Sequence, residues 1–126
     1  MREIKFKAFL KKVKRVLNVI SIDFVNDGGF VEVNLYGDGG DYFYFKDIEL
    51  MQYSGMKDVK GNEIYDGHIL KTDNSFCEIW TVSYNGSSFV ANQGNIDYFC
   101  SLDKFMESSS VEIIGTIYGN PELIPS

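Results

Sequence analysis

Short hydrophobic stretches alternate with glycine-bearing turn sequences along almost the whole chain. The stretches are rich in aromatic and β-branched residues, which favour strands. We expect strands over residues 19–25, 30–36, 42–45, 48–53, 68–72, 76–84, 88–92 and 111–118. Between them, turns are expected at Asn26–Gly29, Gly37–Asp41, Asp58–Gly61 and Asn85-Gly86, because these residue types accept tight-turn conformations. The pattern is typical of a mainly β protein.

The N-terminal stretch fits two structures equally well. Apolar and polar residues nearly alternate over residues 4–10, which predicts a half-buried strand. Apolar residues between Phe9 and Ile20 also recur at helical spacing, and Lys11-Lys12 could lie in a hairpin turn. Periodicity alone leaves both structures open.

One short helix is predicted after Ser101. The Ser101 hydroxyl suits an N-cap, and Asp103 would lie in the first turn, where a negative charge is favourable. Leu102, Phe105 and Met106 would form its inner face. At the end of the chain, residues 120–123 predict a closing helical turn or a tail.

Aromatic side chains form the first candidate for a binding surface. Strand alternation places Tyr42 and Tyr44 on one face and Phe43 and Phe45 on the other. The same reasoning puts Trp80 and Tyr84 on a common side of the strand over residues 76–84. Core packing accounts for most aromatic residues of this kind. The functional hypothesis is a partner-binding surface made by Tyr42, Tyr44, Trp80 and Tyr84.

Composition supports a folded domain. The chain has 126 residues, of which 44% are hydrophobic and 15% aromatic, and this excludes a disordered chain. No apolar run approaches the length of a membrane span, so we expect no membrane association. The basic N-terminus is followed by neither an apolar segment nor a cleavage site, so we also expect no signal peptide.

Cysteine and histidine usage predicts no catalytic residue, metal site or cofactor. Cys77 and Cys100 have no CxxC spacing, and we interpret both as buried thiols in a reducing compartment. A zinc site would need more ligands, and His68 is the only histidine. We expect His68 to be a half-exposed strand residue.

The net charge of −6 is unevenly distributed. Residues 1–17 contain seven Lys or Arg residues and one acid, whereas the remainder contains five bases and 17 acids. Such a basic run is usually a solvated face. The alternative is contact with nucleic-acid phosphates. Its candidate residues are Lys5, Lys7, Lys11, Lys12, Lys14 and Arg15.

Clustered acids suggest a further alternative, a metal-dependent enzyme. The carboxylates concerned are Asp38, Asp41, Asp47 and Glu49. A cation site needs several oxygens that converge from a tight loop, and the GDGGD sequence supplies only two carboxylates. Ordinary turn chemistry explains these residues better, and no nucleotide-binding or nucleophile motif accompanies them.

Three segments resemble one known family. They are REIKFKAF near the N-terminus, FKDIELMQYSGMKDVKGNEIYDGHILK over residues 45–71, and VEIIGTIYGNPELI over residues 111–124. Together they resemble the YopX family of phage and prophage proteins over nearly the whole chain. The family supplies no established activity. His68 stands where members tend to carry an Asp, which argues against a catalytic role for it across the family.

The resemblance implies a two-part, mainly β fold. Residues 1–45 would form an N-terminal β region, in which residues 2–25 are strands joined by a Lys-rich turn. Residues 46–126 would form a small SH3-like barrel with the short helix and a C-terminal tail, and both parts could pack as one domain. We therefore expect a non-enzymatic protein-interaction module in the cytoplasm of a bacterial host. Its partner would be a host or phage protein, or a second copy of the chain.

Overall fold

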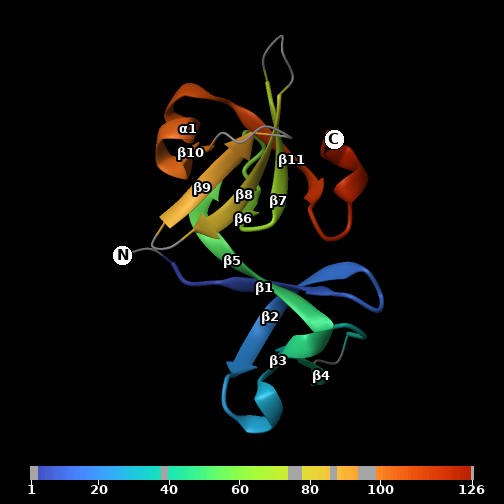
Figure 1. Ribbon diagram of the computed structural model, residues 1–126. Coiled ribbons are helices and arrows are strands. Elements are labelled where there is room, and N and C mark those ends of the chain that lie inside the picture. The colour runs from blue at the N-terminus through green and yellow to red at the C-terminus, as the bar shows by residue number, and fades with distance from the viewer. Residues whose placement is uncertain (1–2, 38–39, 74–77, 86–87, 94–98, 126) are drawn as a thin grey trace. The chain divides into compact units, whose positions relative to one another are not determined.

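Two antiparallel sheets account for most of the structure in the computed structural model, which describes residues 3–37, 40–73, 78–85, 88–93 and 99–125 (Figure 1). Contacts divide the chain into two compact units. The N-terminal unit is Glu3–Gln52, and the C-terminal unit is Tyr53–Ser126. Each unit has its own hydrophobic core. The mainly β prediction is confirmed.

The N-terminal unit is built from antiparallel strands. Its elements are β1 (Phe6–Leu10), β2 (Arg15–Asp23), the 3-10 turn η1 (Asn26–Gly28), β3 (Phe30–Val33), β4 (Asp41–Tyr44), the 3-10 turn η2 (Phe45–Asp47) and the first half of β5 (Ile48–Lys57). Their sheet also includes β6 (Glu63–Tyr65) and has the order β4-β3-β2-β1-β5-β6. Ala8 of β1 pairs with both Leu17 of β2 and Leu50 of β5. The N-terminal stretch is therefore a strand hairpin with a Lys-rich turn, and the helical alternative is wrong.

One face of this sheet forms the core of the N-terminal unit. Its fully buried members include Ala8, Leu10, Val31 and Val33. Further side chains pack around them, namely Leu17, Val19, Ile22, Leu35, Phe43, Phe45 and Leu50. The core thus collects alternate residues of each strand, because successive side chains point to opposite faces of a sheet.

Strand β5 runs through the division between the two units. Its register with β6 (Glu63–Tyr65) shifts between Tyr53 and Lys57. Gly55 lies within this irregularity with φ of +90°, a conformation that glycine adopts without a steric penalty.

The C-terminal unit contains a second sheet with the order β10-β9-β8-β7-β11. Its elements after β6 are β7 (His68–Thr72), β8 (Ile79–Asn85), β9 (Ser88–Gln93), β10 (Phe99–Ser101), the helix α1 (Leu102–Ser108), β11 (Val111–Thr116) and the 3-10 turn η3 (Pro121–Leu123). The predicted helix is confirmed, since the Ser101 hydroxyl accepts a hydrogen bond from the Lys104 N–H at 3.4 Å. Phe76, Cys77 and Gly86 lie outside the described residues.

The core of the C-terminal unit lies between β7, β8, β9, β11 and α1. It contains Ile64, Leu70, Trp80, Val82, Phe89, Ala91, Leu102, Phe105 and Val111. The rings of Trp80 and Phe105 lie 4.5 Å apart. Helix α1 therefore uses Leu102 and Phe105 as its inner face, as the sequence predicts.

The carboxylate of Asp58 forms hydrogen bonds with both the turn after β5 and strand β11. Asp58 Oδ1 accepts hydrogen bonds from the N–H groups of Lys60 and Asn62, and Oδ2 accepts one from Ile113, which is 55 residues away. Burial would raise the pKa of this carboxyl. The hydrogen bonds from Ile113, Asn62 and Lys60 outweigh burial and hold the pKa of Asp58 below its ordinary value.

We predict that this carboxylate makes the free energy of unfolding depend on pH. Because the pKa of Asp58 is lower in the folded state, its contribution is complete above the unfolded pKa of about 4 and is lost as the pH falls below that value. Asp58→Asn should lower the free energy of unfolding by about 2 kcal/mol at neutral pH, because one carboxylate oxygen becomes an amide donor. Urea unfolding of the wild-type protein and of the Asp58→Asn variant at several pH values measures the pH dependence and the loss of stability. A difference between the two proteins that stays constant down to acid pH would contradict this prediction.

Candidate functional site

Alternation along β4 and into η2 separates four aromatic residues into a half-buried pair and an exposed pair. Phe43 and Phe45 pack against the core of the N-terminal unit, whereas Tyr42 is 61% exposed and Tyr44 is 46% exposed. This confirms the two faces that the sequence predicts. Exposed aromatic side chains that lie together can mark an interaction site.

The exposed tyrosines line an open groove, which we call the β4 groove. It has a volume of about 390 Å³ and is lined by Asp27, Phe30, Tyr42, Phe43 and Tyr44. Phe30 pairs with Tyr44 across β3 and β4, and its ring meets the Tyr42 ring edge-on at a centroid distance of 5.7 Å. The groove therefore combines aromatic walls with one carboxylate.

The loop that carries Asp27 is held by the preceding acid. Asp23 accepts hydrogen bonds from the N–H groups of Val25 and Asn26 and from the Asn26 side chain, each at 2.9 Å. The hydrogen bonds from Asn26, and then the one from Val25, hold the pKa of Asp23 below its ordinary value. Asp27 itself has φ of +54°, a left-handed conformation that Asp tolerates better than most residues. The turn thus places a carboxylate at the rim of the groove.

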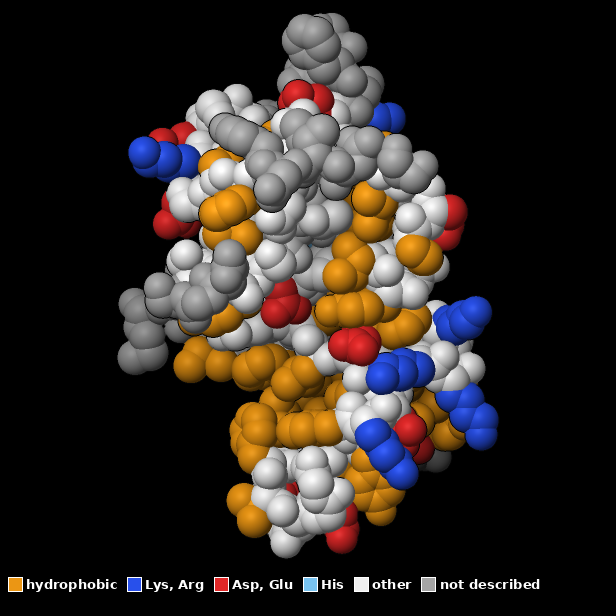
Figure 2. Space-filling model, in the orientation of Figure 1, with side chains coloured by type: hydrophobic (Ala, Val, Ile, Leu, Met, Phe, Trp, Pro, Cys, Tyr) orange, Lys and Arg blue, Asp and Glu red, His pale blue; other side chains and the backbone are white. Residues whose placement is uncertain are grey.

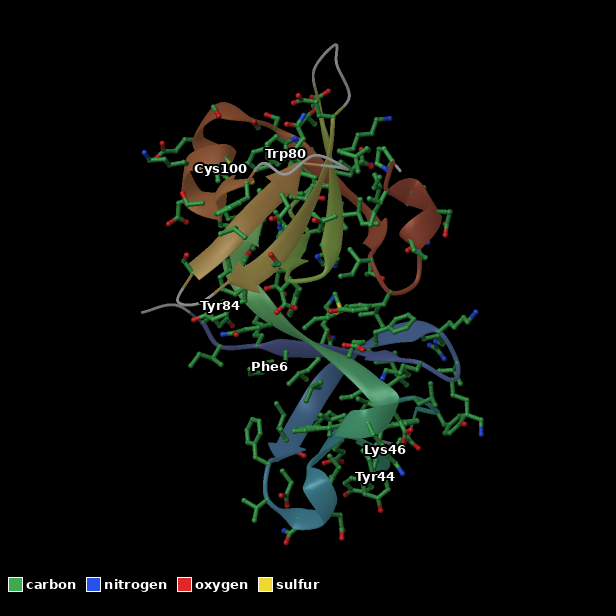
Figure 3. The ribbon with its side chains drawn as sticks, in the orientation of Figure 1. Phe6, Tyr44, Lys46, Trp80, Tyr84 and Cys100 are labelled. Atoms are coloured by element: carbon green, nitrogen blue, oxygen red, sulfur yellow. The ribbon has the colours of Figure 1, made fainter. Side chains whose placement is uncertain are left out.

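A second open groove continues past Tyr44. It has a volume of about 330 Å³ and is lined by Asp27, Gly28, Gly29, Tyr44, Phe45 and Lys46. The Lys46 Nζ lies 5.9 Å from the centre of the Tyr44 ring, and Figure 3 shows the two residues next to each other. A cation at this distance from an aromatic face is attracted by the ring. Asp27 and Tyr44 are common to both grooves.

The other two predicted partner-binding residues belong to the C-terminal unit. Trp80 is only 6% exposed and lies in the core against Phe105, so its assignment to a surface is wrong. Tyr84 is 46% exposed and packs against the buried Phe89 ring at 4.8 Å. The difference arises because α1 covers the part of β8 that carries Trp80.

Two of the clustered acids make structural contacts through their carboxylates. Asp41 Oδ2 accepts a hydrogen bond from the Leu35 N–H, and Glu49 forms an ion pair with Lys11 at 3.6 Å. Asp47 contributes its backbone carbonyl, which accepts a hydrogen bond from the Lys11 N–H. Asp38 lies outside the described residues. Within the part of the chain that the structure describes, no group of three or more His, Cys, Asp or Glu side chains could hold a metal ion.

The candidate nucleic-acid contacts gather on the β1–β2 hairpin. Residues 11–14 are exposed in the turn between these strands, and Arg15 is exposed at the start of β2. Lys5 pairs with Glu3 at 3.3 Å, and Lys7 is half-buried in β1. Figure 2 shows Lys and Arg side chains gathered at the side where this turn lies.

His68 and Cys100 are poor candidates for catalysis. His68 is buried, which corrects the half-exposed position expected for it, and its Nδ1 accepts a hydrogen bond from the Tyr65 N–H at 2.9 Å. Cys100 is a free thiol that packs beside the C-terminal core, and burial raises its pKa. A raised pKa keeps the thiol protonated and weakly nucleophilic.

Comparison with known proteins places the chain in a family. The family model described as YopX protein matches residues 5–125. The chain belongs to the YopX family. No curated protein matches this YopX-family chain.

Two solved structures share the fold of this YopX-family chain. One is protein EF1440 from Enterococcus faecalis, with 22% identity, a TM-score of 0.64 and coverage of 99% of this chain and 100% of that one. The other is protein yopX from Bacillus subtilis, with 16% identity, a TM-score of 0.64 and coverage of 100% of this chain and 98% of that one. At these identities the likeness establishes the fold alone.

Sequence reasoning missed two residues of the β4 groove in this YopX-family chain. Phe30 was part of a predicted strand and Asp27 part of a predicted turn, but neither was a candidate for binding. The alternation of Phe30 with Val31 could have indicated an outward ring. Nothing in the sequence indicates that η1 brings Asp27 to the same place.

Among the described residues of this YopX-family chain, no helix has the length and apolar character of a membrane span.

We predict that substitutions at two neighbouring residues of β4 lower stability by unequal amounts. Phe43→Ala should lower the free energy of unfolding by about 2–4 kcal/mol, because it leaves a cavity in the N-terminal core. Tyr42→Ala should lower it by less than about 1 kcal/mol, because most of this side chain already faces water. Urea unfolding of both variants measures the difference, and equal losses would contradict the assigned faces.

Proposed function

We propose that this chain is a non-enzymatic protein-interaction module that acts in the cytoplasm of a bacterium carrying a phage or prophage. The observation that supports this proposal is the exposure of Tyr42 and Tyr44 beside an open groove. Tyrosine is enriched at protein interfaces because it supplies a large contact area at a low entropic cost. The family resemblance supports the phage or prophage setting.

The fold assignment that goes with this proposal is a small SH3-like barrel in the C-terminal half. Two observations support it. Five short antiparallel strands form a sheet in the order β10-β9-β8-β7-β11, and β6, which directly precedes β7 in the sequence, pairs with β5. Small barrels of this kind often present aromatic residues to peptides.

Capture of a partner tests the proposal. We expect the full chain, immobilised in bacterial lysate at physiological salt, to retain a protein partner or a second copy of itself. Substituting Tyr42→Ala and Tyr44→Ala together should reduce the retained amount about tenfold, because interface energy concentrates in a few aromatic anchors.

The matched control is Tyr84→Ala, which removes a tyrosine with the same exposed fraction as Tyr44 from the other unit. If Tyr84→Ala lowers the retained amount and the β4 substitutions do not, the binding surface lies on the C-terminal unit. A strictly monomeric chain that retains nothing would overturn the proposed function.

A second candidate function is nucleic-acid binding by the β1–β2 hairpin. The observation in its favour is that Lys12, Lys14 and Arg15 are exposed, and no ion pair of theirs is recorded with another described residue. Unpaired cations on a tight turn can contact phosphates without breaking internal bonds.

The salt dependence of binding to a DNA duplex tests this second function. Each phosphate contact adds about one unit to the slope of log affinity against log salt, so Lys12→Gln with Arg15→Gln should reduce the slope by about two. Fluorescence anisotropy over a salt series measures it. Lys71→Gln with Lys104→Gln, two exposed lysines of the C-terminal unit, is the control. Equal slopes for all three proteins, or no binding at low salt, would exclude this function.

A further inference from the structure

Strand β4 is an edge of its sheet. The order β4-β3-β2-β1-β5-β6 leaves its outer side without a neighbouring strand among the described residues. Edge strands are often protected by short length, charged side chains, Pro or a bulge, because their unpaired backbone groups can bind another chain. Strand β4 is short and begins with Asp41, but it contains no Lys or Pro, and its pairing with β3 has no bulge.

The two exposed tyrosines also direct their backbone groups away from β3. The Phe45 N–H donates a hydrogen bond to the Gly29 carbonyl at 3.0 Å. Hydrogen-bonded and non-hydrogen-bonded pairs alternate along an antiparallel ladder, so Phe43, two residues earlier, shares its hydrogen bonds with β3. The N–H and C=O groups of Tyr42 and the N–H group of Tyr44 therefore point to the open edge, where an added strand would meet them. The C=O group of Tyr44 belongs to the first hydrogen bond of η2, because Tyr44 is the N-cap of that turn.

The side chains of these residues match the repeat of an added strand. Tyr42 and Tyr44 stand on one face at a spacing of about 7 Å, which is the repeat of alternate residues in any strand. A segment that pairs with the β4 backbone would place alternate side chains beside the two rings and over the β4 groove. Backbone pairing would supply affinity and the groove would supply specificity.

Acidic side chains on the face of the tyrosines favour a basic ligand in the β4 groove, whereas the cation of Lys46 lies over the Tyr44 ring and lines the second groove. Register places Glu32 opposite Tyr42 and Asp23 opposite Phe30, so both acids share the face of the tyrosines. Their carboxylates already accept hydrogen bonds within the chain, from Ser21 and Gly40 for Glu32 and from Val25 and Asn26 for Asp23.

Asp27 differs from these two acids because the structure records no hydrogen bond or ion pair of its carboxylate with another described residue. It lines both grooves together with Tyr44. An aromatic wall next to an unpaired carboxylate is suited to an Arg or Lys side chain, through cation–π attraction and an ion pair.

We propose that the β4 edge binds an extended segment of a partner protein by strand addition, with an Arg or Lys side chain in the β4 groove against Tyr44 and Asp27. The inference rests on the proposed function and specifies the ligand class of the same site.

A second copy of this chain fits the edge less well. The Lys-rich turn of another copy has the required charge, but it is a tight turn closed by the Lys14 N–H on the Leu10 carbonyl at 2.7 Å and cannot lie as a strand. Two β4 edges paired with each other would bring the acidic residues of both copies onto adjoining surfaces, which is unfavourable.

Selection from a library of random short peptides displayed on a neutral carrier tests the inference with the full chain. We expect the retained peptides to be enriched in β-branched residues around one Arg or Lys. Replacing that base by Gln in a synthetic copy of the best peptide should weaken binding about tenfold. The substitution Asp27→Asn in the protein should weaken binding of the parent peptide by a similar factor and leave binding of the Gln-substituted peptide unchanged. Asn is the matched substitution because it also tolerates the left-handed conformation of this turn.

Backbone methylation tests strand addition separately from charge. N-methyl groups at the peptide positions that face β4 should abolish binding, whereas N-methyl groups at the intervening positions should leave most of it, because only alternate N–H groups pair with a neighbouring strand. Isothermal titration measures each dissociation constant. Equal effects at both sets of positions would refute strand addition.

Other outcomes distinguish the inference from the proposed function. Enrichment of acidic or proline-rich peptides without a base, or no enrichment, overturns the inference. Self-association that Tyr42→Ala abolishes would assign the edge to a second copy and overturns it as well. If lysate capture still depends on Tyr42 and Tyr44 in these cases, the interaction function stands and only the ligand class is wrong.

Discussion

Burial of one face of β3 and β4 is the constraint on which the candidate site depends. Val31, Val33, Phe43 and Phe45 contribute to the N-terminal core, and a shift of one residue in register would exchange them for polar and exposed side chains. Since the hydrophobic effect holds this register, it also holds Tyr42 and Tyr44 outside. Gly29 completes the arrangement, because the Phe45 ring occupies the space where a Cβ at this position would lie, at 2.6 Å. The exposed aromatic surface is thus a consequence of core packing on the opposite face.

The two units distribute charge differently. Residues 1–52 contain eight bases and eight acids, whereas residues 53–126 contain four bases and ten acids, so the net charge of −6 comes from the second part of the chain. Residues 1–52 are neutral as a whole, but bases gather at the β1–β2 turn, and the acids Asp23 of β2 and Glu32 of β3 share the face of Tyr42 and Tyr44. Local charge therefore describes a binding surface on this unit better than net charge does. The C-terminal unit depends instead on buried contacts, among them the Asp58 carboxylate and the packing of α1 against Trp80.

Sequence reasoning was most accurate where a local rule decides the structure. Ser101 caps α1 because its hydroxyl needs only a backbone N–H three residues away, and β7 covers the expected residues because its apolar run is bounded by turn sequences. It was least accurate for Trp80 and His68. Alternation assigns each side chain to one side of a strand, but only the position of α1 makes the Trp80 side a core. The Nδ1 atom of the buried His68 accepts a hydrogen bond from the Tyr65 N–H, and this pairing has no signature in the sequence.

Local sequence patterns were sufficient to establish the strand-rich class, the short helix, the family and the opposite faces of Tyr42 and Phe43. These follow from periodicity, capping chemistry and turn residues, all of which act between neighbours along the chain. The tertiary structure decided that β4 is an edge strand, that Phe30 and Asp27 join its tyrosines, and that Trp80 does not. The physical reason is that strand order and groove formation depend on contacts between segments far apart in sequence, which no local pattern records.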